Sequence, residues 1–307
     1  PLIEEMDSWK IHFMDTIRGG DWLGDQDAIE IMVKEAADIV FEYESAGCVF
    51  SRTPAGRIAQ RPFGGHSKPR VCYSSDWTGH VLLNTLFEQL LELEVTLYDE
   101  WYVLDLILEG TQCKGAVALN IRDGEIYYFC AKVVVLCTGG FSRIFKTSSN
   151  PNINTGDGLA MVYRTGIPLM DMEFIQFHPT GLYKRGILLS EACRGEGAYL
   201  LNSSYDRFMA LYAPDRMELA PRDIVSKAEQ MEINNGRGIG PDKQGVWMDL
   251  RHLGSELINQ RLSQVLKIAK KLSNIDVTTD LIPIQPTAHY SMGGIPTDVW
   301  GRVISSS

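Results

Sequence analysis

The chain has 307 residues, of which 45% are hydrophobic and 22% are charged, and its formal net charge at pH 7 is −10. These values are ordinary for a globular protein with room for two domains and a sizeable core. The acidic balance excludes a general nucleic-acid binder, which needs a basic face, but a locally cationic pocket for an anionic small substrate remains compatible with it.

The first helix of the chain is predicted between residues 25 and 46. Asp25-Gln26-Asp27 offers N-caps, with Glu30 three residues after Asp27 as in a capping box. Apolar residues then recur at helical spacing, and Gly47 ends the pattern. We expect this helix to be structural.

An irregular segment follows over residues 50–80 and leads into a second predicted helix. Its run Arg61-Pro62-Phe63-Gly64-Gly65 would expose an aromatic side chain on a flexible loop, as a wall for a small ligand. The amphipathic helix is expected from about Thr78 to Leu93, with Val81, Leu82, Leu86 and Leu90 on one face.

Residues 95–138 have the character of β-structure. Turn signals at Glu109-Gly110 and Asp123-Gly124 separate three strand-like runs, and the second turn is a strong hairpin signal. The next run, Val133–Cys137, is continuously apolar, which predicts a strand buried on both faces of a parallel sheet. It stops at Thr138-Gly139-Gly140, where α/β sheets bind ligands. These patterns predict a nucleotide-type α/β domain.

The stretch from Thr155 to Gly197 is the candidate active-site segment. Glycines and titratable side chains gather there in clusters between apolar runs, which lets backbone approach a ligand closely. Beyond it, residues 199–281 are predicted to be mostly helical, with helices near 226–234 and 254–272. Another Gly-terminated cluster, Thr287–Gly294, follows two prolines.

The six cysteines form no C-x-x-C pair, and their spacing fits neither a metal site nor a disulfide framework. We expect buried, reduced thiols and no metal site. No apolar run approaches the length of a membrane span, and no signal peptide is visible. Because the chain begins without Met and stops just after an apparent strand, GRVIS, we expect an internal fragment of a longer protein.

Many motifs along the chain resemble, in the same order, those of the flavoprotein subunit of succinate dehydrogenase and fumarate reductase. They are GDQDAIE, QRPFGG, TGHVLLNTL, CTGG, NTGDGLAM, DMEFIQFHPTG, CRGEG, YAP, PRDIVS, RHLG and PTAHYSMGGIPT. A set of this length in one order is far more specific than any single motif.

The resemblance implies an α/β fold with a Rossmann-like FAD-binding domain that carries a small antiparallel β-meander, plus an inserted α+β capping domain. The FAD-binding domain would comprise residues 1–172, the capping domain 173–288, and the return into the FAD-binding domain 289–307. The implied activity is FAD-dependent interconversion of succinate and fumarate, and the same site serves both directions.

By the same resemblance, Arg222 corresponds to the family's proton-transfer arginine, and Glu191 and Arg194 to its relay partners. Because an arginine is normally always charged, it needs such partners to act as a base. The implied substrate-binding residues are His178, Ser190, His289 and Phe63. Ser190 replaces the more usual Thr and keeps the hydroxyl donor.

For the cofactor, the resemblance implies that Asp157 contacts FAD and that the backbone of Thr138, Gly139 and Gly140 approaches the flavin nucleotide. Read from the residues alone, Asp157 is equally a turn-forming Asp beside two glycines. The chain departs from the family pattern because it lacks the amino-terminal G-x-G-x-x-G, the flavin-linking His and the later substrate-binding Arg. Trp77 and Ala192 stand where many members have Arg and Gly.

The implied partners are membrane anchor subunits together with an iron–sulfur subunit, with quinone reached indirectly through them, since the chain has no cluster-type cysteines. The resemblance implies a place in the tricarboxylic acid cycle and electron transport. The implied location is peripheral, on the cytoplasmic face of a bacterial membrane or the matrix face of the inner mitochondrial membrane. L-aspartate oxidase, which shares the fold, is one alternative, and a non-catalytic dicarboxylate-binding relative is another.

Overall fold

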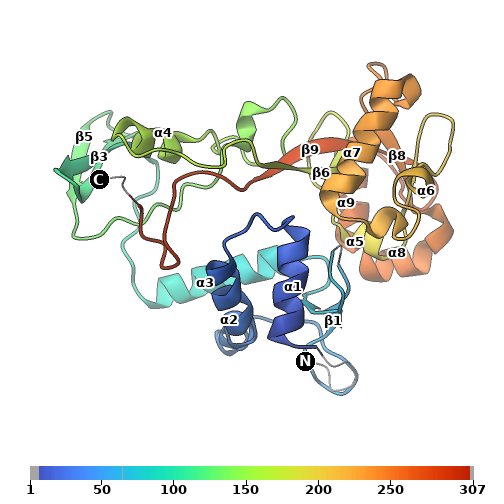
Figure 1. Ribbon diagram of the computed structural model, residues 1–307, viewed down its shortest axis with the longest axis horizontal. Helices are drawn as coiled ribbons and strands as arrows, with labels where there is room; N and C mark the ends of the chain where they lie inside the picture. The colour runs from blue at the N-terminus through green and yellow to red at the C-terminus, as the bar shows by residue number, and fades with distance from the viewer. Residues whose placement is uncertain (1–6, 64, 305–307) are drawn as a thin grey trace. The chain divides into compact units, whose positions relative to one another are not determined.

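The structure is a computed structural model that describes residues 7–63 and 65–304 (Figure 1). It consists of two compact units. One contains residues 1–93 and 177–287, and the other contains 94–176 and 288–307. The predicted functional domain boundaries, at 172/173 and 288/289, remain a prediction, because compactness within this chain does not test which residues bind the cofactor.

The first unit begins with helices α1 (Trp9–Gly19), α2 (Gln26–Ser45) and α3 (Thr78–Glu92), and a short hairpin of β1 (Gln60–Arg61) and β2 (Val71–Cys72). The predicted α2 and α3 are confirmed, whereas α1 was not predicted. Asp25 caps α2 by accepting the amide hydrogens of Asp27 and Ala28. The predicted capping box is therefore wrong, and Glu30 pairs with Lys34 one turn later instead. The Phe63 loop lies between β1 and β2, and Gly64 lies outside the described residues.

The rest of the first unit is an antiparallel sheet with helices. Its strand order is β6-β9-β8-β7. The strands are β6 (Ile175–Leu182), β7 (Tyr199–Leu201), β8 (Val246–Asp249) and β9 (Ile282–Ser291), of which β6 and β9 continue into the second unit. The helical segments are α5 (Ala192–Gly195), α6 (Met209–Tyr212), η2 (Met217–Leu219), α7 (Arg222–Glu232), η3 (Ile233–Arg237), η4 (Arg251–Leu253), α8 (Ser255–Arg261) and α9 (Ser263–Ser273).

The sheet and helices of residues 182–284 enclose one hydrophobic core. The sheet contributes Leu200, Met248 and Ile282, and the helices contribute Val225 and Ile258, all fully buried. The prediction of a mostly helical segment missed β7 and β8. The single helix predicted over 254–272 is two helices, because the backbone leaves helical geometry at the buried Leu262.

The second unit contains the predicted meander. Strands β3 (Trp101–Glu109), β4 (Gln112–Asn120) and β5 (Ile126–Cys130) form an antiparallel sheet in sequential order. Both predicted turns are confirmed. The second joins β4 to β5, with Leu119 opposite Ile126 and Gly124 at φ +77°. The unit also contains η1 (Ser142–Ile144) and α4 (Asp157–Arg164).

The apolar run Val133–Cys137 differs from its prediction. It forms no strand, and Val133 and Val135 are 76% and 77% exposed instead of buried on both faces. A strand needs neighbours to take its backbone hydrogen bonds. No strand pairs with this run among the described residues.

The six cysteines are free, as predicted, but only Cys48 and Cys193 are buried, whereas Cys130 and Cys137 are exposed. Burial raises the pKa of the Cys193 thiol to about 12. No helix in the described ranges has both the length and the apolar character needed to cross a bilayer. Ser305, the last residue of the apparent strand GRVIS, lies outside the described residues.

Candidate active site

Glu191 is the centre of a buried charge cluster in the first unit. Its Oε2 accepts a hydrogen bond from Arg222 Nε at 2.7 Å and lies 2.6 Å from Arg222 Nη2. Its Oε1 lies 3.0 Å from Arg194 Nη2. One carboxylate therefore pairs with two guanidinium groups, through a charge-assisted hydrogen bond from Arg222 and an ion pair with Arg194.

The two arginines of this cluster differ in exposure. Arg194 is 1% exposed, and its Nη1 donates to the backbone oxygens of Glu218 at 2.6 Å and Ala220 at 3.2 Å. Burial lowers the pKa of Arg194, and the neighbouring carboxylate of Glu191 opposes this shift. The Arg222 side chain, on the first residue of α7, is 29% exposed. The cluster therefore runs from the interior at Arg194 to the surface at Arg222.

His178 lies beside this cluster on β6 and is fully buried. The backbone N–H of Thr180 donates to its Nδ1 at 3.2 Å, while the Thr180 hydroxyl donates to the Leu189 carbonyl at 2.7 Å. Because Nδ1 acts as an acceptor, the neutral ring carries its proton on Nε2. Nε2 lies 3.9 Å from Glu191 Oε2. The ring is thus oriented by its own strand with its donor toward Glu191.

Ser190 precedes Glu191 in the turn that leads into α5. Its Oγ accepts the amide hydrogen of Ala192 at 3.2 Å, which fixes the turn. A hydroxyl that accepts in this way can still donate its proton to a carboxylate. The turn therefore holds a hydroxyl donor, a carboxylate and an arginine within five residues.

Phe63 is half-buried in the loop between β1 and β2. The guanidinium of Arg61 lies 5.4 Å from the centre of its ring and 4.5 Å from that of Tyr73. Burial lowers the pKa of Arg61, while carboxylates that include Glu196 and Glu191 raise it. The end of β1 and the residue after β2 therefore place a cation and a second aromatic beside Phe63, and neither was predicted as a site residue.

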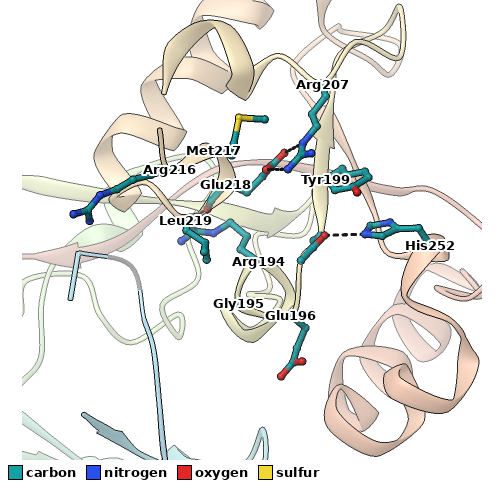
Figure 2. A pocket seen from close by; sticks show the side chains of 12 residues that line it. Arg194, Gly195, Glu196, Tyr199, Arg207, Arg216, Met217, Glu218, Leu219 and His252 are labelled. Atoms are coloured by element: carbon teal, nitrogen blue, oxygen red, sulfur yellow. Dashed lines mark hydrogen bonds and ion pairs between the residues drawn. The ribbon is translucent and has the colours of Figure 1, made fainter. Parts of the chain in front are cut away.

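A cavity of about 340 Å³ opens next to this cluster but contains none of the predicted substrate-binding residues. Gly195 and Gly197 line it, and Figure 2 shows the Arg194 side chain extending alongside Gly195. Arg207 donates to both oxygens of Glu218, and His252 bonds the Gly197 carbonyl at 2.9 Å. Arg194 lines this cavity, whereas Glu191 and Arg222 do not.

The second unit holds the predicted cofactor residues. Thr138 and Gly139 are exposed, and Gly139 adopts φ +69°, which favours glycine. A Cβ on Gly158 would lie 1.9 Å from Thr138 Oγ1, so this glycine allows the loop to contact the start of α4. Asp157 is exposed in the first turn of α4, where its carboxylate accepts from Thr155 Oγ1 at 2.9 Å.

These residues fit a dinucleotide. Exposed backbone amides next to glycines can approach phosphates, and an exposed carboxylate can accept hydrogen bonds from sugar hydroxyls. Gly140 is the exception, because a Cβ there would lie 2.9 Å from Ser291 Oγ, so its close approach is to β9.

His289 lies near the end of β9, in the second unit. Its Nδ1 is 2.7 Å from Ser149 Oγ, and its carbonyl accepts from Asn150 Nδ2 at 2.7 Å. The segment 149–150 thus orients this histidine. Sequence reasoning missed both Asn150 and Ser149, although a hydroxyl and an amide beside a proline are a usual turn signal.

A family model described as "FAD binding domain" matches residues 1–307. The chain belongs to this family. It is 47% identical over 306 residues to a succinate dehydrogenase flavoprotein subunit from Rickettsia bellii, and 45% identical over 309 residues to the mitochondrial succinate dehydrogenase flavoprotein subunit of Oryza sativa. Each match covers 97% of this chain but only 51% and 49% of the two relatives, so the chain spans about half of their length.

Among solved structures, E. coli quinol fumarate reductase FrdA is similar, with a TM-score of 0.94 and 39% identity over 97% of this chain and 53% of that one. The predicted fold class, an FAD-binding fold with a meander and an α+β part, is therefore confirmed, and so is the prediction of FAD as the cofactor. The predicted role of each site residue stays a prediction.

Proposed function

We propose that this chain is part of a catalytic flavoprotein that interconverts succinate and fumarate. The observation that carries the proposal is the Glu191 carboxylate, which bridges Arg222 at 2.6–2.7 Å and Arg194 at 3.0 Å. The names of the relatives, succinate dehydrogenase and fumarate reductase flavoprotein subunits, support the same reaction.

The reaction removes a hydride from one carbon of succinate and a proton from its neighbour. When bound, FAD supplies the acceptor for the hydride equivalent. We assign to Arg222 the role of accepting the proton that leaves succinate. We call Arg222, Glu191 and Arg194 the proton relay. Because Glu191 accepts from Arg222, it can take up the proton that Arg222 would otherwise hold permanently. In fumarate reduction the proton moves in the opposite direction along the same atoms.

The substrate carries two carboxylates, which need donors or cations. We assign them to the Nε2–H of His178, the hydroxyl of Ser190 and His289, with the ring of Phe63 against the carbon skeleton. Nδ1 of His178 is held by the Thr180 amide, so its Nε2 donor needs no reorientation on binding. We assign Asp157 and the backbone of Thr138 and Gly139 to the cofactor, and leave Gly140 out because its close approach is to β9.

We further propose that electrons leave through an iron–sulfur subunit to membrane anchor subunits and quinone. This places the protein peripherally on the cytoplasmic or matrix face of its membrane. The support is that the relatives are named as subunits. The test is copurification of the full-length protein from membranes with an iron–sulfur protein, and a flavoprotein that fractionates alone from solution would contradict this assignment.

The experiment that tests the reaction is dye reduction by the full-length holoenzyme with succinate or L-aspartate as the donor. We expect succinate to be oxidised and L-aspartate to give less than about 1% of that rate, because a site built for two carboxylates leaves an ammonium group without an acceptor. Faster oxidation of L-aspartate would identify an aspartate oxidase. Dicarboxylate binding without turnover would identify a non-catalytic relative.

A further inference from the structure

A second glutamate, Glu229, is buried next to the proton relay. It lies on α7, seven residues after Arg222, which is about two turns and about 10 Å along the same helix face. Ser226, between them on that face, donates to the Phe177 carbonyl at 2.6 Å, so this face packs against the strand that carries His178. Glu229 therefore points into the protein on the side of the site.

Glu229 is 0% exposed, and neither of its carboxyl oxygens has a hydrogen-bond partner among the described residues. The charged group that faces it from a neighbouring element is Arg194 on α5. On α7 itself, Lys227 is exposed and paired with Asp223, and Glu232 is paired with Arg237. Ionising a carboxyl group in such a place costs far more than leaving it as an acid.

The charge on Glu229 decides the net charge of the site. With Glu229 as an uncharged acid, Arg194, Arg222 and Glu191 leave one net positive charge to face a dicarboxylate. With Glu229 ionised, the four groups sum to zero, and Arg194 is shared between two carboxylates instead of being held by Glu191. An uncharged Glu229 therefore favours both the substrate and the Glu191–Arg194 pair.

We propose that Glu229 is a positioning residue of the proton relay, which as an uncharged carboxylic acid leaves the charge of Arg194 to Glu191 and the net positive charge of the site to the substrate. The proposal rests on the proposed function for the identity of that substrate. Burial raises the pKa of Glu229 well above its usual 4.5, in agreement with the geometry.

The test compares the full-length holoenzyme with its Glu229→Gln and Glu232→Gln variants. Glutamine is isosteric with the uncharged acid. Glu232 is the matched control, because it is a buried glutamate on the same helix that is held ionised by Arg237. Thermal unfolding and the Kd for succinate are measured across the pH range in which the protein is folded.

A raised pKa in the folded state means that the native protein binds more protons than the unfolded chain above pH 4.5, so stability falls as pH rises. The difference in Tm between Glu229→Gln and the wild type should therefore shift by about 2–4 °C in favour of the variant as pH rises. The Tm of Glu232→Gln should show no such shift relative to the wild type. Parallel Tm curves for Glu229→Gln and the wild type would overturn the assignment of a buried acid.

At neutral pH, the Kd for succinate should agree within about twofold between the wild type and Glu229→Gln. At the alkaline limit of the pH range, the wild type should bind succinate roughly tenfold more weakly than Glu229→Gln does. Tighter neutral binding by Glu229→Gln, or equal binding at the alkaline limit, would overturn the proposal. If none of the three proteins binds succinate, the proposed function fails, and the Tm curves show separately whether Glu229 is a buried acid.

Discussion

Glu191 shows what can be predicted about a site at the scale of single residues. Its pairing with Arg194 follows from their positions in one short turn. Its contact with Arg222 joins residues 31 positions apart, which no local pattern predicts, and only the motif resemblance suggested it. The bridge depends on a fold that brings the start of α7 to the turn before α5.

Replacing Glu191 with glutamine tests the bridge. The Glu191→Gln variant of the full-length protein should lose about 100-fold or more in kcat for succinate-dependent dye reduction, because an amide cannot take up the proton from Arg222. The control is Glu196→Gln, five residues later, whose carboxylate pairs with Arg261 at 3.1 Å and not with an arginine of the relay. Turnover of Glu191→Gln within about threefold of the wild type would contradict a role for Glu191 in proton transfer.

Several buried glutamates were missed because glutamate is usually solvated. Glu218 and Glu232 are each satisfied by a bidentate arginine, Arg207 at a separation of 11 residues and Arg237 at a separation of 5. Neither separation is the three or four residues of a helical side-chain pair, so the sequence shows no periodic signal for these contacts.

The ion pair between Glu232 and Arg237 makes the free energy of unfolding depend on pH. Hydrogen bonds from Arg237, Tyr212 and Asn202 lower the pKa of Glu232 from 4.5 to about 2. A lowered pKa in the folded state means that the stabilisation is present above pH 4.5 and is lost as pH falls toward 2. The loss is on the order of 2 kcal/mol, since Arg237 is partly exposed.

Acid titration of thermal unfolding measures this effect. The Tm of the wild type should fall between pH 4.5 and pH 2, whereas Glu232→Gln should begin lower and lose less over that interval. Equal slopes for the two proteins would show that the Glu232 carboxylate contributes no pH-dependent stability.

At the scale of elements, the long helices and the meander were predicted and the sheet of β6 to β9 was not. β7 and β8 are short, and β9 contains Pro283 and Pro286, which argue against a strand. Pro283 lies opposite Trp247 and cannot donate, but its carbonyl accepts from Tyr183. β9 therefore pairs with β6 and β8 on its two sides although it contains two prolines.

The start of α9 depends on a residue far away in the sequence. Asp76 Oδ2 accepts the amide hydrogen of Gln264, in the first turn of α9, at 2.6 Å. Asp76→Ala should destabilise the protein by about 1 kcal/mol, as the loss of a helix cap does, and should speed hydrogen exchange in α9.

The control is Asp25→Ala, which removes the local cap of α2 and should speed exchange in α2 alone. Hydrogen exchange measured by mass spectrometry distinguishes the two variants. Unchanged exchange of α9 in Asp76→Ala would refute the long-range cap.

At the scale of the whole molecule, the fold class and the family were predictable because many motifs occur in one order. The grouping of residues 1–93 with 177–287 in one compact unit was not, since it depends on contacts between distant segments such as that of Asp76 with Gln264. Val133 and Val135 belong to an apolar run that predicted a buried strand, yet both side chains are exposed. Such a run is buried only where neighbouring strands pair with it.

Cofactor retention tests the assignment of the second unit. Asp157→Ala in the full-length protein should lower the flavin-to-protein absorbance ratio after gel filtration, with flavin binding about tenfold weaker, since the hydrogen bonds to a charged acceptor are lost. Asp99→Ala, at another exposed aspartate of the same unit, should retain the flavin. Full retention by Asp157→Ala would remove Asp157 from the cofactor site.

The central claim is that Arg222 moves the proton between substrate and protein, and the kcat of Arg222→Ala tests it most directly. In the full-length holoenzyme, succinate-dependent dye reduction by Arg222→Ala should fall by about 100-fold or more, while the flavin stays bound. Arg216→Ala, at an exposed arginine outside the relay, should retain the rate of the wild type. Normal turnover by Arg222→Ala would contradict the account.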